Sequence, residues 1–386
     1  MKKIDMSKIT GKKWLMILII IVLLIIYDGL AVQTSIVSRA VAVGIAIDLD
    51  DQNQIELSAQ VILPRNGGQT QGGNDFAIFT ASGETIQECV AEMNTSIGAI
   101  ASFAHTTVIV LGKKMLDDGR TDILREMMAS PIVSDNVQLV CAEDKAKDIL
   151  TAKVSINEVS SYHLQRLLQS GHNQSSVIPT NLKTFFMHYT HVGQTSYMPI
   201  VVRKETDKPI SNGGQGGDDK EPYYLLDVSN TLVYTRDRYC CQLNREQSRG
   251  LSYVLFALDD GILTYEDDRG KLSEATLVRS RCDRTYNRDT REVVLTITMI
   301  IRNAQNSNLN HNAFDVALSD TERERIETNV RNDILNCYEY AKSNGADVFF
   351  LGETAYGSLG KYWEYKDDPD YLQKMLLRVE IRLRSE

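Results

Sequence analysis

Two histidines are spaced so that both could reach one metal ion. His188 and His191 form an H-x-x-H pair, which would place them about one turn apart on the same side of a helix. Imidazole nitrogens are common zinc ligands, but a zinc site needs further ligands, and no Glu or Cys lies near this pair in the sequence. A surface or helix-capping pair is therefore the favoured interpretation, and the sequence predicts no metal site.

Other groups that could act in catalysis are equally incomplete. Residues 357–360 (GSLG) resemble a nucleophile elbow, but Tyr356 stands where that motif has its first glycine. Glu84 and Glu88 are one helical turn apart, which is more typical of a solvated helix face than of an acid and base pair. His105 precedes an apolar run and is interpreted as a hydrogen-bonded residue at a strand end. The sequence predicts no catalytic residue, no cofactor-binding residue and no cofactor, so we expect a protein that is not an enzyme.

Stretches rich in oxygen ligands or in glycine give no better binding site. Asp48, Asp50 and Asn53 carry oxygens suited to calcium, but the spacing of an EF-hand loop is absent, so a polar hairpin turn is expected. The segments 65–74 (RNGGQTQGGN) and 204–221 (KETDKPISNGGQGGDDKE) lack the glycine spacing of phosphate-binding loops. The first is interpreted as a long hairpin loop, and the second as a linker between two domains.

The elements that must position these residues alternate between strand and helix before the linker. At 84–97, for example, apolar residues recur at helical spacing, whereas 106–111 (TTVIVL) is a short apolar run typical of a core strand. Strands are predicted at 41–47, 55–63, 106–111 and 137–141, and helices at 84–97 and 121–128. This alternation indicates mixed α/β layers.

After the linker the pattern is one of long strands beside one long helix. Ser319 and Glu322 have the spacing of a capping box at the start of that helix, and Gly345 supplies a left-handed stop at its end. Another helix is predicted at 246–258, and strands at 223–234, 238–243, 293–301 and 377–383. The second half is therefore predicted to be α+β.

Length and composition restrict the class of protein. The chain has 386 residues, of which 43% are hydrophobic and 24% charged, so two or three globular domains are expected. A net charge of −9 argues against general binding to nucleic acid, which needs clustered Lys and Arg. The six cysteines are scattered, form no C-x-x-C pair, and are interpreted mostly as buried small apolar side chains.

The N-terminus is the one strongly biased segment. Residues 1–13 carry five lysines against one aspartate, a net +4 that leaves −13 for the rest of the chain. They precede an apolar stretch, residues 14–32, which begins with Trp14, ends with Val32 and is uncharged as far as Tyr27. This layout predicts either a signal removed near Gly29 and Ala31 or a retained signal anchor. In both cases the basic segment stays in the cytoplasm and the remaining residues lie outside it.

Six short motifs, in their order and spacing, resemble one known family. They are 40–48 (AVAVGIAID), 81–86 (ASGETI), 103–112 (FAHTTVIVLG), 145–150 (KAKDIL), 243–250 (LNREQSRG) and 345–349 (GADVF). Together they resemble the C subunits of bacterial spore germinant receptors, the Ger(x)C family, over nearly everything after residue 40. The match of motifs across more than 300 residues is specific, although each motif alone is weak.

The chain departs from this family at its membrane attachment. Members are usually lipoproteins whose signal ends in a lipid-modified cysteine, and that position falls at about Leu30 here, between Gly29 and Ala31. No cysteine precedes Cys89, so lipid attachment in the usual way is not possible. The departure favours an uncleaved transmembrane helix at 14–32, which would replace the lipid.

The resemblance implies an α+β protein with a multi-domain mixed α/β ectodomain behind a single N-terminal membrane helix. The expected divisions are a basic cytoplasmic region (1–13), the anchor (14–32), an N-terminal α/β region (33–203), the linker (204–221) and a C-terminal α+β domain (222–386). The implied function is that of a non-enzymatic subunit of a spore nutrient germinant receptor, supporting assembly or signal relay during germination.

The implied partners are the A-type and B-type membrane subunits of that receptor, and the implied location is the spore inner membrane, with a single pass. The alternative is a membrane-anchored extracytoplasmic solute-binding or envelope structural protein without a receptor role.

Overall fold

The computed structural model describes most of the chain after residue 38. The described residues are 39–62, 76–129, 132–154, 159–173, 177–206, 222–236, 238–259, 261–302, 304–305, 314–315 and 318–385, together with 14, 16 and 18–22. They fall into two compact units, Met1–Arg39 and Ala40–Glu386. All contacts discussed below lie in the second unit.

The predicted anchor at 14–32 lies largely outside the described residues. Those of its residues that are described, 14, 16 and 18–22, are helical, and their apolar side chains are exposed. In the described part of the chain, no helix is long and apolar enough to cross a membrane.

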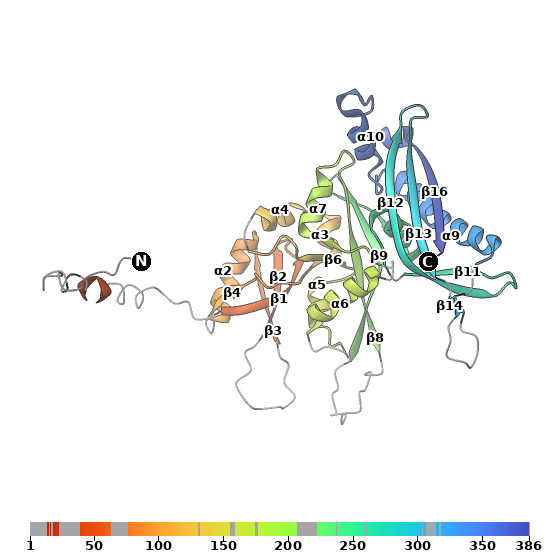
Figure 1. The fold of residues 1–386 in the computed structure, drawn as a ribbon. Coiled ribbons are helices and arrows are strands. Elements are labelled where there is room, and N and C mark those ends of the chain that lie inside the picture. The colour runs from red at the N-terminus through yellow and green to blue at the C-terminus, as the bar shows by residue number, and fades with distance from the viewer. Residues whose placement is uncertain are drawn as a thin grey trace. The chain divides into compact units, whose positions relative to one another are not determined.

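The larger sheet is mixed, with a central parallel block (Figure 1). The parallel strands, in spatial order, are β8 (Thr195–Thr206), β6 (Gln138–Ala142), β5 (Val108–Gly112) and β1 (Arg39–Leu49). Antiparallel strands continue the sheet beyond β1 with β2 (Ile55–Ile62) and β3 (Phe76–Gly83), and beyond β8 with β9 (Tyr223–Thr235) and β10 (Arg238–Leu243). Short β4 (Ile100–Ser102) pairs with β1, and β7 (Thr180–Asn181) pairs with β6.

Helices cover both faces of the parallel block, because its strands are apolar on both sides. Along β1, Ile45 and Ile47 point into one core and Ala46 points into the other, and all three are buried. The first core is covered by α2 (Ile86–Ile97), α3 (Lys113–Asp117), α4 (Asp122–Ala129) and α7 (Leu182–Tyr189). The second is covered by α5 (Ala146–Thr151) and α6 (Ser160–Asn173). The predicted α/β layering of this half is confirmed.

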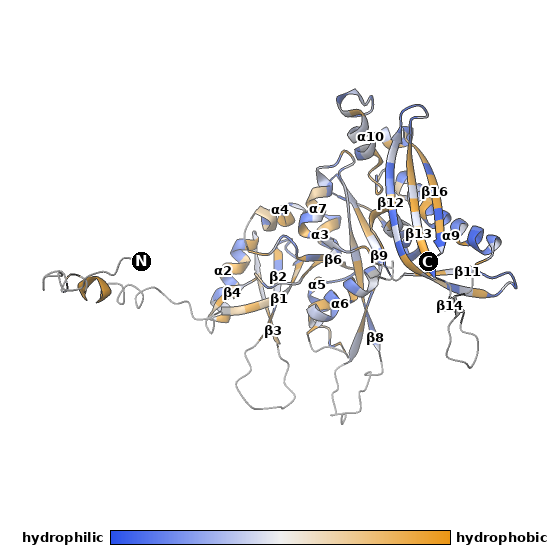
Figure 2. Cartoon of the chain, in the orientation of Figure 1, coloured by the Kyte–Doolittle hydropathy of each residue, from blue (hydrophilic) through white to orange (hydrophobic). Residues whose placement is uncertain are grey.

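A second sheet, built from the C-terminal half, is covered by helices on its apolar face. Its strands in order are β11 (Gly261–Glu266), β12 (Leu272–Asn287), β13 (Glu292–Arg302) and β16 (Leu376–Ser385). The elements around it are α8 (Arg245–Leu255), α9 (Asp320–Ser343), α10 (Leu351–Leu359), the 3-10 turn η3 (Gly360–Tyr362), α11 (Tyr371–Lys374) and the pair β14 (Ala304–Gln305) and β15 (Phe314–Asp315). Figure 2 shows β13 largely hydrophobic and β12 largely hydrophilic. Along both strands buried residues alternate with more exposed ones, so this sheet has one buried and one exposed face.

The segment expected to link two domains runs between strands that pair with each other. β8 and β9 form an antiparallel ladder that begins with Thr206 opposite Tyr223, and residues 207–221 lie outside the described part of the chain. β9 and β10 thereby extend the first sheet although they follow the linker in sequence. Val233 and Leu243 on these strands are buried in the same core as the helices of the C-terminal half.

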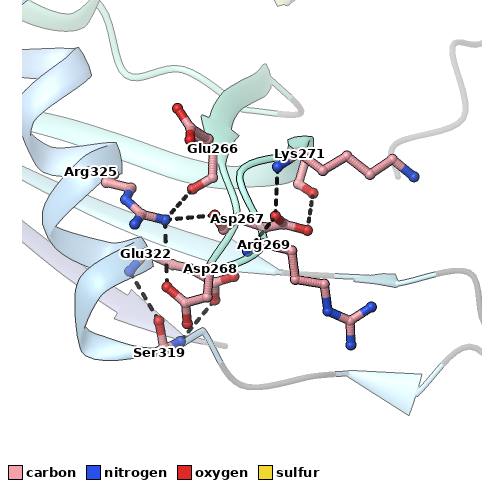
Figure 3. A network of polar contacts seen from close by, with 9 residues as sticks. Glu266, Asp267, Asp268, Arg269, Lys271, Ser319, Glu322 and Arg325 are labelled. Atoms are coloured by element: carbon pink, nitrogen blue, oxygen red, sulfur yellow. Dashed lines mark hydrogen bonds and ion pairs between the residues drawn. The ribbon is translucent and has the colours of Figure 1, made fainter.

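The longest helix begins as its sequence predicts. Ser319 and Glu322 form a reciprocal capping box, with each side chain accepting a hydrogen bond from the other residue's backbone N–H. One turn further on, the Arg325 guanidinium donates to the carbonyls of Glu266 (2.8 Å) and Asp267 (2.7 Å) in the turn that joins β11 to β12 (Figure 3). The start of α9 is thereby fixed to the end of the second sheet.

Gly250 permits close contact between α8 and α9. A Cβ atom at this position would collide with the backbone carbonyl of Asp333. We therefore expect Gly250→Ala to lower the free energy of unfolding, measured in urea, by about 1–3 kcal/mol, because the backbone of the facing helix cannot yield as a side chain could.

The matched control is Gly357→Ala in α10, where an added Cβ meets nothing within 4 Å. This substitution should leave stability unchanged or raise it by about 0.5–1 kcal/mol, since alanine favours the helix. Equal effects of the two substitutions would contradict the packing argument.

Candidate functional site

The motifs found in the sequence meet one another at the ends of helices. Asp48, at the end of β1, is buried, and its carboxylate accepts hydrogen bonds from the backbone N–H groups of Ala146 (2.8 Å) and Lys147 (2.9 Å) at the start of α5. At the end of β5, a Cβ on Gly112 would collide with the same carboxylate. Burial raises the pKa of Asp48, and the two backbone hydrogen bonds oppose that rise. Three of the six motifs thus form one capping site.

A second cluster fixes α5 and α6 on the sheet. The fully buried Gln60 of β2 donates from its side-chain amide to the carbonyl of Leu150 (3.0 Å) and to the hydroxyl of Ser160 (3.0 Å). Its amide oxygen accepts hydrogen bonds from the backbone and the hydroxyl of Ser161. Gly44 faces Ser161, and a Cβ there would collide with the serine hydroxyl. These groups are satisfied within the protein and are structural.

A third cluster of buried polar and aromatic residues lies where the two sheets meet, and we call it the junction. It comprises Asp347, Phe350 and Tyr371 from the C-terminal half and His188, His191, Gly193 and Thr195 from the segment that leads into β8. The Asp347 carboxylate, 4% exposed, accepts hydrogen bonds from the N–H groups of Leu351 and Gly352 (2.8 Å each). It accepts a third from the Tyr371 hydroxyl at 2.6 Å. Asp347 therefore starts α10 and holds α11 against it.

Opposing effects act on the pKa of the Asp347 carboxyl group. Burial raises the pKa of Asp347, while the hydrogen bonds from Tyr371, Gly352 and Leu351 lower it. Burial also raises the pKa of Tyr371, and the neighbouring carboxylate adds to that rise. The tyrosine therefore stays a hydrogen-bond donor over the physiological range.

Two glycines allow the Tyr371 ring to occupy this place. A Cβ on Gly193 would lie 2.7 Å from the Tyr371 hydroxyl oxygen, and one on Gly352 would lie 2.7 Å from a ring carbon. Gly193 belongs to the segment before β8 and Gly352 to α10. The tyrosine is thus packed between the two halves of the chain.

Three hydrogen bonds cross the junction directly. The Asp347 N–H donates to the Thr195 hydroxyl (3.2 Å), and the Val192 N–H donates to the Glu353 carboxylate (3.3 Å). At the end of β9, Arg236 donates to the Pro369 carbonyl (2.8 Å). No local sequence pattern indicates these pairs, because their members lie more than 130 residues apart.

The histidine pair lies inside the junction, so the prediction of a surface or capping pair is wrong for His188. This residue is 4% exposed, and its ring lies 5.5 Å from that of His191 and 4.7 Å from that of Phe350, centroid to centroid. Burial, with smaller contributions from His191 and Arg284, lowers the pKa of His188 from 6.5 to about 4. At neutral pH it is therefore an uncharged ring in an aromatic cluster.

The remaining predicted candidates are not brought together. His105 is exposed in a turn, and Ser358 lies within α10 rather than at a strand-to-helix turn. Glu88 accepts a hydrogen bond from the Glu84 N–H at 2.9 Å, as part of an exposed helix start. Asp50 accepts hydrogen bonds within the turn between β1 and β2, which confirms the polar hairpin turn. Among the described residues, no three His, Cys, Asp or Glu side chains are grouped to hold a metal ion.

A surface pocket of about 210 Å³ lies between α8, α9 and β11. At its wall the Arg249 Nε donates to the Asp333 carboxylate at 2.7 Å. This ion pair joins α8 to α9, next to the close contact at Gly250. It contributes to the packing of the two helices.

Two family models match the chain, one for each half. Residues 33–203 match the spore germination protein N-terminal domain, and residues 229–386 match the family described as spore germination B3/GerAC like, C-terminal. The YfkR protein of Bacillus subtilis (strain 168) is 25% identical over 221 residues, covering 55% of this chain and 54% of that protein. Spore germination protein GerQC of Bacillus cereus is 24% identical over 194 residues, covering 50% of this chain and 52% of that protein. The alignments span about half the length of these relatives.

The crystal structure of the GerBC protein has a similar fold. The comparison gives a TM-score of 0.52 at 14% identity and covers 89% of this chain and 96% of that chain. It supports the mixed α+β, multi-domain fold described above.

Replacing His188 by Phe keeps an aromatic ring against Phe350 and removes the group that titrates. His188 stabilises the fold fully above its ordinary pKa of 6.5, and this contribution is lost as the pH falls toward about 4, because the unfolded chain binds the proton first. We expect the free energy of unfolding to fall by up to about 3 kcal/mol from this group over that window, and the fall to be absent from His188→Phe. Urea titrations across the window measure the difference.

The control for this experiment is His105→Gln, which removes an exposed histidine. It should keep the wild-type pH profile. Asp347 and the other acidic groups are common to all three proteins, so the comparison isolates His188. Parallel profiles for the wild type and His188→Phe would show that the buried histidine does not titrate as argued.

Tyr371→Phe removes one hydrogen bond to the Asp347 carboxylate and leaves the ring in place. We expect it to lower the free energy of unfolding by about 1–3 kcal/mol, and Asp347→Ala to cost more, because three buried donors then lose their acceptor. In the double mutant the two costs should fall short of their sum by about 1–3 kcal/mol. Tyr362→Phe, at a residue 80% exposed, is the neutral control, and strictly additive costs would contradict the coupling.

Proposed function

Since the chain belongs to the Ger(x)C family of spore germination proteins, we propose that it is a non-enzymatic, membrane-tethered subunit of a spore nutrient germinant receptor. It supports receptor assembly or relays the germinant signal during spore germination. The observation that carries this proposal is the match of both family models, which together reach from residue 33 to residue 386 and leave only residues 204–228 between them.

The contacts made by the motif residues are internal to the protein. Asp48, Asp347 and the glycines beside them serve helix starts and close packing, and their polar groups are satisfied inside the protein. A protein of this kind acts through its outer surfaces. The proposed partners are the A-type and B-type membrane subunits of the receptor.

The tether in this proposal is the apolar stretch 14–32. It is supported by the lysine-rich segment before it and by the absence of a cysteine near Leu30 for lipid attachment. The chain then passes the membrane once, with residues after 32 outside the cytoplasm, in the spore inner membrane.

The test is affinity capture of the tagged full chain from detergent-solubilised spore membranes, combined with deletion of its gene. We expect two polytopic partners, the A-type and B-type subunits, in the captured material, and slower nutrient germination in the deletion strain. Loss of the partners from deletion spores would indicate assembly, whereas partners that accumulate without responding to nutrients would indicate relay.

A strain with His105→Gln, at an exposed site outside the junction, is the matched control and should behave as wild type. Deletion spores that germinate normally in every nutrient, with both partners at normal abundance, would overturn the proposal. Extraction of the chain from membranes by alkaline carbonate would overturn the tether alone.

A further inference from the structure

The surface pocket between α8, α9 and β11 contains a tyrosine whose polar group is not used by the protein. Tyr253 of α8 lines the pocket and is 1% exposed, yet its hydroxyl forms no hydrogen bond to any residue that the structure describes. Burial raises the pKa of Tyr253, and of its two charged neighbours Arg249 opposes that rise while Asp333 adds to it. The hydroxyl therefore stays protonated beside this ion pair. Because a buried hydroxyl normally has a hydrogen-bond partner, the pocket is the place from which one can come.

Arg249 is held by one of its nitrogens and leaves two others free. Its Nε donates to the Asp333 carboxylate at 2.7 Å, and the two side chains are 35% and 14% exposed. Neither Nη group of Arg249 has a partner among the described residues, although the side chain lines the pocket. A guanidinium fixed in this way presents its Nη groups as a fork that matches the two oxygens of a carboxylate.

Glu246 supplies an opposite charge on the same wall of the pocket. It lies one turn before Arg249 on α8, and its charge acts on the pKa of both Arg249 and Asp333. Residues three apart on a helix can pair, but these two described side chains form no ion pair with each other. An unpaired carboxylate and the free end of a guanidinium thus line the same space.

The charges around the pocket favour a ligand that carries both signs. Glu246, Arg249 and Asp333 are the charged members of its lining, so the site as a whole has one excess negative charge. A simple anion would meet that excess, and a simple cation would leave the Arg249 fork unused. A molecule with a carboxylate and an ammonium group a few bonds apart satisfies both.

The remaining wall is apolar and the space is small. Ile262, 56% exposed, lines the pocket from β11, and the buried Ile326 and Val330 line it from α9. The volume of about 210 Å³ equals that of roughly seven water molecules in the liquid, which suits a ligand of about seven to nine non-hydrogen atoms. Apolar walls with a few converging polar groups are typical of small-molecule sites.

We propose that this pocket binds a small dipolar molecule, an α-amino acid with a short apolar side chain. The ligand carboxylate accepts hydrogen bonds from the Nη groups of Arg249 and from the Tyr253 hydroxyl, and the ammonium group lies at the Glu246 carboxylate. The apolar side chain contacts Ile262 and Val330. This inference goes beyond the proposed function, because the binding needs this chain alone, and its failure would leave the receptor proposal unaffected.

Saturation-transfer NMR on the purified full chain in detergent micelles tests the inference with L-alanine, L-valine and L-leucine as probes. We expect at least one of them to bind with a Kd of about 1 mM or lower. Two analogues of valine each lack one charge: isovalerate has no ammonium group and isobutylamine has no carboxylate. Each should bind at least about tenfold more weakly than L-valine, because one charged group of the site then stays unpaired.

Tyr253→Phe removes the free hydroxyl and keeps the ring. It should weaken amino-acid binding about tenfold and leave the urea midpoint of unfolding unchanged, because the hydroxyl makes no hydrogen bond within the described protein. Tyr362→Phe, at a residue 80% exposed, is the matched control and should change neither quantity. Unchanged binding by a folded Tyr253→Phe protein would count against the site.

Glu246→Gln separates the two charges of the ligand. It should weaken the binding of L-valine about tenfold and leave that of isovalerate unchanged or stronger, because only the ammonium group lies at Glu246. Glu339→Gln, an exposed position of α9 outside the pocket, removes the same charge and should bind as the wild type does.

The remaining outcomes overturn the inference. Binding that survives both Tyr253→Phe and Glu246→Gln would place the amino acid elsewhere on the chain. Equal affinity for L-valine and isovalerate would assign the pocket to carboxylates rather than to dipolar molecules. No saturation transfer to any of the three amino acids at about 10 mM would show that Arg249 and Asp333 serve only the packing of α8 on α9.

Discussion

The buried carboxylate of Asp347 is the interaction on which the arrangement of the two sheets depends. A carboxylate taken out of water is costly unless hydrogen bonds replace its hydration. Two backbone N–H groups at the start of α10 and the Tyr371 hydroxyl supply them. Because its own N–H donates to Thr195 of β8, the same residue also connects the C-terminal half to the first sheet. One residue thus satisfies a helix start, holds an aromatic ring and connects the C-terminal half to the first sheet.

The same physical solution appears at the other end of the first sheet. Asp48 stands at the end of a strand, accepts hydrogen bonds from the free N–H groups of a helix start, and lies against a glycine that leaves room for its carboxylate. In both places a short motif joins elements distant in sequence. The motif residues are therefore accounted for by packing and capping, which directs the search for function to the outer surfaces.

Sequence patterns predicted the long periodic elements well and the contacts between elements poorly. The structure confirms the helix that begins after Ser319 and ends before Gly345, and the strands β13 and β16. Each of these elements was predicted from the periodicity of apolar residues within its own segment. β12 was not predicted, because a bulge after Leu277 and the polar residues Ser280 and Arg284 at core-facing positions break the apolar alternation. The burial of His188 depends on Phe350, which is far along the chain, so no local pattern could reveal it. Pairing of β8 with β9 was likewise hidden by the composition of the segment between them.

That pairing bears on how the chain could transmit a signal. While the ladder from Thr206 opposite Tyr223 to Thr195 opposite Thr235 stays formed, bending at the segment between the two strands cannot separate the two halves. The junction at Asp347 also opposes rotation of the C-terminal half against the first sheet. Such a rotation would expose a buried carboxylate and an aromatic cluster to water. A relay through this protein would then move the two halves together against its surroundings.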